Sequence, residues 1–133
     1  MKFTTADKWF SLYIRLRDIV QDDMVVCITC GRLYHWRKVD CGHFVSRGKP
    51  MTRFNEQNCH AQCKGCNCFR VGQQAIHGKM IDKKYGVGTS DKLLALGNIR
   101  GQKTHTKLAL KEIAKEYRIK AKEIAKQKGI DLK

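Results

Sequence analysis

Two Cys-x-x-Cys pairs constrain the fold of this chain more than any other feature of its sequence. Cys27 and Cys30 form the first pair, and Cys63 and Cys66 form the second. Four thiolates are the ligand set of a closed tetrahedral zinc site, so we expect a structural Zn²⁺ ion. More residues separate Cys30 from Cys63 than the roughly 15 to 20 that separate the pairs of a simple zinc ribbon. A folded segment must therefore lie between the pairs.

The segment between the pairs predicts a β-hairpin. It is rich in β-branched and aromatic residues and contains Gly42, Gly48 and Pro50, the only proline of the chain. This composition favours two short strands joined by a turn near residues 48–50. The ends of a hairpin return close together, so a zinc ion could clamp its base. A redox dithiol is the competing role for a Cys-x-x-Cys pair, but it usually needs only one pair beside a βαβ pattern, which this sequence lacks.

The remaining cysteines do not indicate disulfides. Seven cysteines is an odd number, and the N-terminal residues show no signal-peptide pattern. Cys41, Cys59 and Cys68 lie outside the two pairs and are expected to be small buried residues. His60 is close enough to Cys63 to be a reserve ligand, although an ordinary packing histidine is the simpler interpretation.

Helical periodicity flanks the hairpin on both sides. Residues 4–7 offer a capping box, and apolar residues then recur at helical spacing as far as Val20, which predicts a helix within residues 1–26. Residues 62–85 are also expected to be helical, with a break near Gly72 or Gly78. A brief helix should follow, with Ser90 or Asp91 as its cap and Gly97 at its end.

The longest periodic segment, residues 104–129, predicts an amphipathic C-terminal helix. Its apolar residues fall on one arc, and they are a candidate contact for a homodimer. A second arc is basic. Two interpretations of the basic arc stay open, a solvated helix face and a rail for DNA phosphates; the residues concerned are Lys107, Lys111, Lys115, Arg118 and Lys122.

The charge of the chain indicates a polyanionic partner. Lysine and arginine number 27 against 12 acidic residues, a formal net charge of +15. Such a charge repels itself in a compact fold unless a polyanion is nearby, so DNA is the expected partner. No apolar run is long enough to cross a membrane, and we expect a cytoplasmic protein.

A chain of 133 residues is long enough for one compact domain but not comfortably for two. We expect a single unit with an N-terminal helix (1–26), a zinc-bound core (27–86) and a helical, basic C-terminal extension (87–133). The expected fold class is α+β.

One acid, one imidazole and one amide could converge beside the zinc site. If zinc holds the second pair at the base of the hairpin, Asn67 lies close to the first strand, which contains Asp40 and His43. Asp40 and His43 would leave opposite faces of a regular strand, and Gly42 could permit a bulge that turns both the same way. Asp40 and Asn67 suit a hard cation, Mg²⁺ or Mn²⁺, and His43 suits a general base near neutral pH.

Each of these residues also has a simpler structural interpretation. An aspartate near a histidine is often only a hydrogen-bonded pair, and an asparagine after a Cys-x-x-Cys pair can cap a helix. The alternative to an enzyme is therefore a non-catalytic zinc-containing DNA-binding module of a recombination complex. A cysteine-based redox regulator is a third interpretation.

The motifs resemble those of the phage NinG/Rap recombination nucleases, a branch of the HNH or ββα-metal endonucleases. The resemblance is carried by "CITCGR", "DCGHF", "SRG" and "RFNEQNCHAQCKGCN", and the flanking "WFSLYIRLRD" and "KEIAKEYRIKAKEI" extend it over nearly the whole chain. The order Cys-x-x-Cys, Asp-x-x-His, Cys-x-x-Cys-Asn is also similar to the junction-resolving endonuclease VII group. That group has an acid three residues after the asparagine, where this chain has Arg70.

The resemblance implies a zinc-clamped ββα-metal core and a structure-specific endonuclease acting on Holliday junctions and D-loops during phage recombination, in the cytoplasm of an infected bacterium. It implies that His43 is the general base, that Asn58 braces a loop, and that Asp40 and Asn67 hold the catalytic metal. A two-fold symmetric junction would suit a homodimer. Four residues that flank this site could hold DNA phosphates or could simply be exposed charges: Arg47, Lys49, Arg53 and Arg70.

Overall fold

The computed structural model describes residues 2–133. Five α-helices, five short strands and four short turns of 3₁₀- or π-helix make up the described chain. In order they are α1 (Thr5–Arg17), β1 (Ile19–Gln21), β2 (Met24–Val26), β3 (Leu33–His35), η1 (Trp36–Lys38), β4 (Val39–His43), α2 (Pro50–Arg53), η2 (Glu56–Asn58), β5 (Cys59–Cys63), η3 (Gly65–Phe69), η4 (Val71–Gln73), α3 (Gln74–Tyr85), α4 (Thr89–Gly97) and α5 (Lys107–Lys128).

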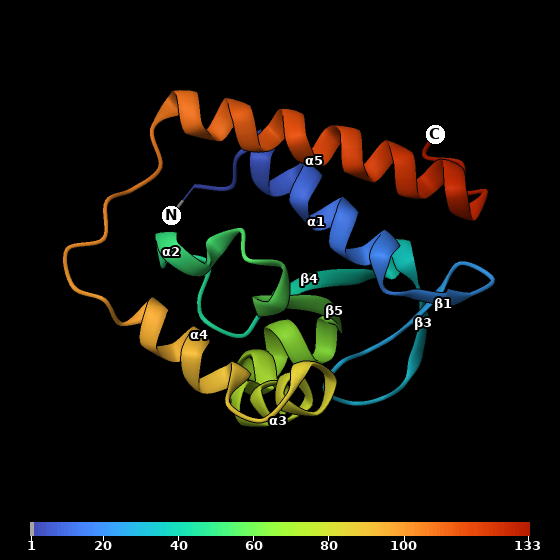
Figure 1. Ribbon diagram of the computed structural model, residues 1–133. Coiled ribbons are helices and arrows are strands. Elements are labelled where there is room, and N and C mark those ends of the chain that lie inside the picture. The colour runs from blue at the N-terminus through green and yellow to red at the C-terminus, as the bar shows by residue number, and fades with distance from the viewer. Residues whose placement is uncertain (1) are drawn as a thin grey trace.

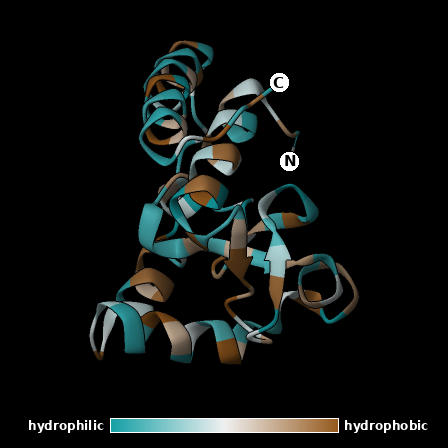
Figure 2. Ribbon diagram, turned by 90° about the vertical axis from the view of Figure 1, so that its right-hand side faces the viewer, coloured by the Kyte–Doolittle hydropathy of each residue, from teal (hydrophilic) through white to brown (hydrophobic). Residues whose placement is uncertain are grey.

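These elements are arranged in layers, and the α+β class is as expected. The long helix α5 lies along α1, and α1 lies on the sheet of β4 and β5, while α3 and α4 lie on the other side of that sheet (Figure 1). Figure 2 shows the two-helix layer above the strands from a second direction. Within residues 2–133, no helix is both long and apolar enough to cross a membrane.

Helix α1 begins as predicted and ends earlier than predicted. Thr4 and Asp7 form a full capping box, in which each side chain bonds the backbone of the other. The helix ends at Arg17, and a three-stranded sheet of order β1-β2-β3 follows. Asp22 and Asp23 turn the chain between β1 and β2 with positive φ angles of 48° and 61°. The prediction that the helical pattern runs to Val20 is therefore wrong, because Val20 lies in β1 and is exposed.

The predicted hairpin is present as the antiparallel pair β4 and β5. Its register runs without a shift from Val39 opposite Cys63 to His43 opposite Cys59. The connection is the long segment 44–58, which contains α2 and η2, so the tight turn predicted near residues 48–50 is wrong. Pro50 instead begins α2, a position that suits its fixed φ angle.

The bulge expected at Gly42 is absent. Close packing against a neighbouring side chain explains why this position is a glycine. A Cβ atom at this position would lie 2.2 Å from Oε1 of Gln62, whose side chain crosses the strand. Side chains of β4 therefore alternate regularly. Val39 and Cys41 pack towards α1, where they meet Leu16 and Phe10 among others.

Helix α5 docks its apolar arc on α1. Tyr117, Ala121 and Ala125 are buried there, while Lys111 and Lys115 are exposed. Because α1 covers this part of the arc, it is not available as the homodimer contact that was suggested for it. Thr106 caps the start of α5 and Gly129 ends the helix with a φ of 67°.

The segment after β5 breaks at Gly72, one of the two expected positions, where φ is 76°. Gly78 instead lies inside α3, where a Cβ atom would be 2.9 Å from the Phe44 ring. The cap predicted for the next helix is wrong, because α4 begins at Thr89 after Gly88 and has no side-chain cap.

His60 is a packing residue rather than a reserve ligand, since its Nδ1 lies 3.0 Å from Nε2 of His77 in α3.

The four paired cysteines form a core of their own. One sulfur from each of Cys27, Cys30, Cys63 and Cys66 lies within 4.8 Å of the others, and Sγ of Cys30 is 3.8 Å from Sγ of Cys63. A tetrahedral site with Zn–S bonds of about 2.3 Å places its sulfurs about 3.8 Å apart. The cluster therefore has the ligand set and the spacing to hold a zinc ion.

Backbone groups support these sulfurs. The Cys63 N–H donates to Sγ of Cys27 over 3.3 Å, and the Cys66 N–H donates to Sγ of Cys63 over 3.4 Å. Burial raises the pKa of the Cys27 thiol, but hydrogen bonds from Cys63, Thr29 and Cys30 outweigh burial and bring it down to about 6. Ile28 in the first Cys loop also donates to the carbonyl of Ala61 in β5 over 3.0 Å. The loop is thereby joined to the hairpin.

We predict that a strong chelator, added under reducing conditions, unfolds the protein. Zinc sites of this kind contribute on the order of 10 kcal/mol, which is comparable with the roughly 5–15 kcal/mol stability of a whole domain. Zinc content by elemental analysis and thermal unfolding by circular dichroism measure this. Cys63→Ala should behave like the chelated protein, whereas Cys68→Ala, at an exposed position outside the cluster, should keep both zinc and stability. An unchanged melting temperature in the chelator would contradict a structural zinc ion.

Candidate functional site

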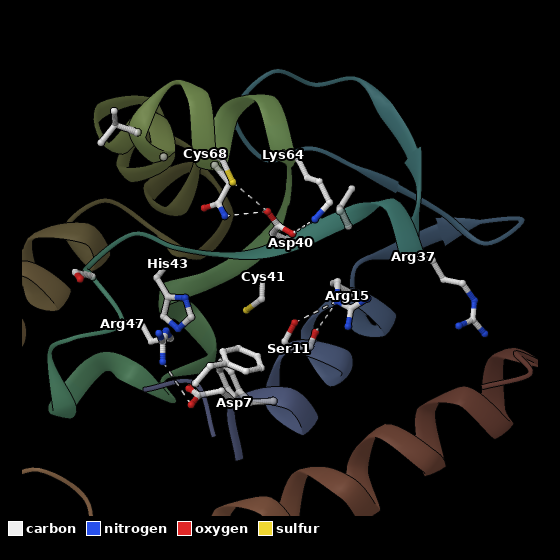
Figure 3. Close-up of a pocket in the computed structure, with 17 residues that line it drawn as sticks. Asp7, Ser11, Arg15, Arg37, Asp40, Cys41, His43, Arg47, Lys64 and Cys68 are labelled. Atoms are coloured by element: carbon white, nitrogen blue, oxygen red, sulfur yellow. Dashed lines mark hydrogen bonds and ion pairs between the residues drawn. The ribbon is translucent and has the colours of Figure 1, made fainter. Parts of the chain in front are cut away.

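A cavity of about 710 Å³ runs along the free edge of β4. In the described residues β4 pairs with β5 alone, so one of its edges is open. Helix α1 walls the cavity on one side and η3 on the other. Asp40, His43 and Asn67 all line it, and Figure 3 shows Asp40 and His43 in place.

Asp40 and Asn67 meet on the η3 side of the strand. The Asn67 Nδ2 donates to Oδ2 of Asp40 over 3.1 Å, and Nζ of Lys64 lies 2.6 Å from Oδ1 of the same carboxylate. Asn67 directly follows Cys66 of the cysteine cluster, which explains why this amide arrives at β4. The structure thus brings together the two residues expected to share a metal ion.

His43 enters the cavity from the α1 side of the strand. Its Nε2 lies 3.0 Å from the carbonyl oxygen of Arg53, and the carbonyl can only accept, so Nε2 carries the proton of the neutral ring. The lone pair is then on Nδ1. Burial lowers the pKa of His43 below its ordinary value, and this favours the neutral ring.

The expectation that Asp40 and His43 leave the same face of β4 is wrong. Because the strand is regular, their odd separation puts them on opposite faces. Figure 3 shows Asp40 on one side of the ribbon and Cys41 with His43 on the other. Asp40 and His43 still line one cavity, because β4 is an edge strand and the cavity along its open edge reaches both faces of the strand.

Four basic residues line the same cavity, and only Arg47 among them was predicted. The others are Arg15 of α1, Arg37 of η1 and Lys64, which follows Cys63. Arg15 is held in place by the carbonyl of Ser11, to which its Nε donates over 3.2 Å. The position of Lys64 within the second Cys loop was a usable sequence signal. Arg15 and Arg37 gave none, because tertiary packing alone brings them there.

The structure does not support the predicted phosphate contact of Arg53. This residue is only 3% exposed, and its guanidinium bonds Asp7, the capping acid of α1. Burial raises the pKa of Asp7, but the hydrogen bonds from Arg53 and Thr4 outweigh it and lower the pKa overall. Lys49 and Arg70 are exposed and lie outside the set of residues that line the cavity.

Asn58 bonds backbone groups within the connection between β4 and β5. It is fully buried. Its Oδ1 accepts from the N–H of Val45 over 2.8 Å, and its Nδ2 donates to the carbonyls of Val45 and Thr52 over 3.0 and 3.1 Å. The Asn58 side chain therefore holds Val45 and Thr52 in place. These two residues bound the segment 45–52, and the next residue, Arg53, supplies the carbonyl that contacts His43.

The basic arc of α5 borders a second hollow, of about 510 Å³, on the other side of α1. Trp9 of α1 lines it beside apolar atoms of both helices, and Nζ of Lys122 lies 5.9 Å from the centre of the Trp9 ring. The other predicted basic residues of the helix line it directly: Lys107, Lys111, Lys115 and Arg118.

We predict that Asn58→Ala costs about 3 kcal/mol of unfolding free energy. The substitution removes three hydrogen bonds and leaves the buried N–H and carbonyl of Val45 without partners, at roughly 1–3 kcal/mol for each group, whereas the Thr52 carbonyl still accepts from the Asn55 N–H. Asn55→Ala is the matched control, because Asn55 makes a single exposed capping bond to the Gln57 N–H and should cost about 1 kcal/mol. Denaturant unfolding of the zinc-loaded proteins measures both values. Equal losses would show that Asn58 is no special brace.

Comparison with known proteins identifies the family of this chain. A profile described as "Bacteriophage Lambda NinG protein" matches residues 3–127. The chain is 31% identical over 124 residues to Protein ninG of Salmonella phage P22 and 30% identical over 122 residues to Protein ninG of Escherichia phage lambda; each match covers 90% of this chain and 55% of the relative. It thus spans about half the length of these relatives. No solved structure matches it significantly. On the strength of the profile and both relatives, the chain belongs to the NinG family of bacteriophage proteins.

Proposed function

We propose that this chain is a divalent-metal-dependent DNA endonuclease of the HNH, or ββα-metal, type. One observation carries the proposal. An acid–amide pair and a half-buried imidazole line a single cavity whose other charged groups are mainly arginine and lysine. Metal-assisted hydrolysis of a phosphodiester uses a metal site, a base and phosphate contacts, and these groups can supply all three.

Asp40 and Asn67 would hold the catalytic ion, Mg²⁺ or Mn²⁺. Both can offer oxygen atoms, which such hard ions prefer, and two protein ligands leave room for waters and a phosphate oxygen. Rotation of the Asn67 amide presents its oxygen in place of Nδ2. When bound, the ion offsets negative charge on the phosphate and the departing oxygen. Lys64 can move aside, since its side chain is 63% exposed.

His43 would act as the general base. Its Nε2–H is committed to the Arg53 carbonyl, which orients the ring, and Nδ1 can take a proton from the attacking water. Asn58, which bonds the adjacent Thr52 carbonyl, and the Asp7–Arg53 pair are positioning residues, because they fix the segment whose Arg53 carbonyl orients the ring.

The basic residues would hold DNA through its phosphates. Arg15, Arg37 and Arg47 line the cavity around the reacting groups, and the net charge of +15 attracts a polyanion from a distance. Phosphate contacts position DNA without reading its sequence. That the substrate is branched, as in Holliday junctions and D-loops, rests on the resemblance to junction-cutting nucleases, and a homodimer would suit a two-fold symmetric junction.

We predict cleavage of branched DNA that requires Mg²⁺ or Mn²⁺ and His43. A junction, a D-loop and a linear duplex of matched sequence are incubated with each protein, and products are resolved on denaturing gels. His43→Ala should lose about 10²- to 10⁴-fold in rate, and Asp40→Asn should lose metal-dependent activity. His35→Ala, which alters a partly exposed histidine outside the cavity, is the matched control. If wild-type protein and His43→Ala bind the junction equally and neither cuts it, the chain is a DNA-binding module instead.

A second prediction decides between the two interpretations of the basic arc of α5. If Lys111 and Lys115 contact phosphates, replacing both with alanine should reduce the slope of log K against log salt by about 1.8 for duplex DNA. Lys79 and Lys83, which are exposed on α3, provide the matched double substitution and should leave the slope unchanged. Fluorescence anisotropy at several salt concentrations gives these slopes. Equal slopes for the two double variants would favour the solvated face.

A further inference from the structure

A second group of metal-ligating side chains lies beside the proposed general base. One ligand atom from each of Cys41, His43 and Cys59 lies within 4.8 Å of the other two. The sheet explains the arrangement. Cys41 and His43 are two residues apart on one face of β4, and Cys59 stands opposite His43 on β5.

The surroundings make this group an open site. Cys59 is fully buried behind the other two, against Phe10 and Tyr117. Cys41 and His43 line the cavity, and Figure 3 shows both side chains on the same side of the β4 ribbon. Two sulfurs and one nitrogen leave the fourth tetrahedral position towards the cavity, the pattern of zinc sites with an exchangeable ligand.

The hydrogen bond of His43 also suits a metal ligand. Metal-bound histidines almost always donate their second N–H to a carbonyl or carboxylate, which fixes the ring and its tautomer. His43 already makes such a bond to Arg53. The lone pair on Nδ1 can therefore accept a proton from water or bind a metal ion, but not both.

We propose that Cys41, His43 and Cys59 bind a soft divalent cation, Zn²⁺ or Cd²⁺, and that this cation inhibits the nuclease by occupying the His43 lone pair. Binding releases the two thiol protons to solvent. Mg²⁺ prefers oxygen ligands and does not compete for this site. The inhibition rests on the function proposed above, whereas the metal binding does not.

The site differs from the four-cysteine cluster in strength. It has three protein ligands rather than four, and one side is open to solvent through the cavity. Its ion should therefore exchange while the cluster keeps its zinc. This difference allows the two sites to be loaded separately.

The direct test is a Co²⁺ titration of full-length, zinc-loaded protein under anaerobic, reducing conditions. Thiolate-to-cobalt charge-transfer absorption reports binding. We expect one equivalent of Co²⁺ beyond the resident zinc, lost in Cys41→Ala, Cys59→Ala and His43→Ala and retained in Cys68→Ala. Cys41 is only partly buried, so Cys41→Ala gives an answer even if Cys59→Ala fails to fold. Absence of the extra equivalent from wild-type protein, or its persistence in Cys41→Ala, overturns the proposal.

The inhibition is tested by cleavage in saturating Mg²⁺ with increasing Zn²⁺ or Cd²⁺, each protein being compared with its own rate without the added metal. The Cys41→Ala variant should need at least about tenfold more Zn²⁺ for the same inhibition, since even the loss of a group that hydrogen-bonds a metal ligand costs about 10- to 100-fold in affinity. Equal sensitivity of wild-type protein and Cys41→Ala overturns the regulatory part. If the protein never cuts DNA, the proposed function fails while the cobalt titration still decides whether the site exists.

Discussion

Four sulfur atoms gather where two distant parts of the chain meet, beside the backbone bond from Ile28 to Ala61 that also joins them. Cys27 and Cys30 lie on a loop after β2, whereas Cys63 ends β5 and Cys66 is the second residue of η3. Without a cation, four thiolates at these distances repel one another; with one, the loop, the hairpin and η3 become a single body. The position of Asn67 beside Asp40 follows from this, because only one peptide bond separates Asn67 from a cysteine of the cluster.

The open edge of β4 then determines what kind of site can form. A central strand would separate Asp40 from His43 by the full thickness of the sheet. At an edge, groups from both faces line one cavity, and α1 and η3 complete its walls. The same alternation places Cys41 beside His43 and sets Cys59 opposite it. The regular alternation along β4 therefore positions both the proposed general base, His43, and the proposed inhibitory metal site that uses the same imidazole.

Local patterns in the sequence predicted the features that depend on neighbours along the chain. The capping box of α1 and the end of α5 at Gly129 are of this kind. The antiparallel pair and the approach of Asn67 to Asp40 join distant positions, and they were predicted from the clamp that the two Cys pairs could form. Strands β1, β2 and β3 were missed because three residues give no measurable alternation. The pairing of Arg53 with Asp7 could not be predicted, since 46 positions separate them and an arginine near a basic hairpin equally suits DNA. The bulge at Gly42 was wrong because a glycine can serve close packing as well as a kink.

Burial distinguishes the two acids of the cavity and decides which one suits an exchangeable cation. Asp7 is 3% exposed and is paired with the equally buried Arg53. Removing one partner from such a pair costs about 3–5 kcal/mol, so Asp7 is committed to structure. Asp40 is paired with Lys64, whose side chain is 63% exposed, and exposed pairs contribute only about 0–1 kcal/mol. An entering divalent ion can therefore displace Lys64 from Asp40 at little cost, whereas displacing Arg53 from Asp7 would leave a buried charge unpaired beside the carbonyl that orients His43.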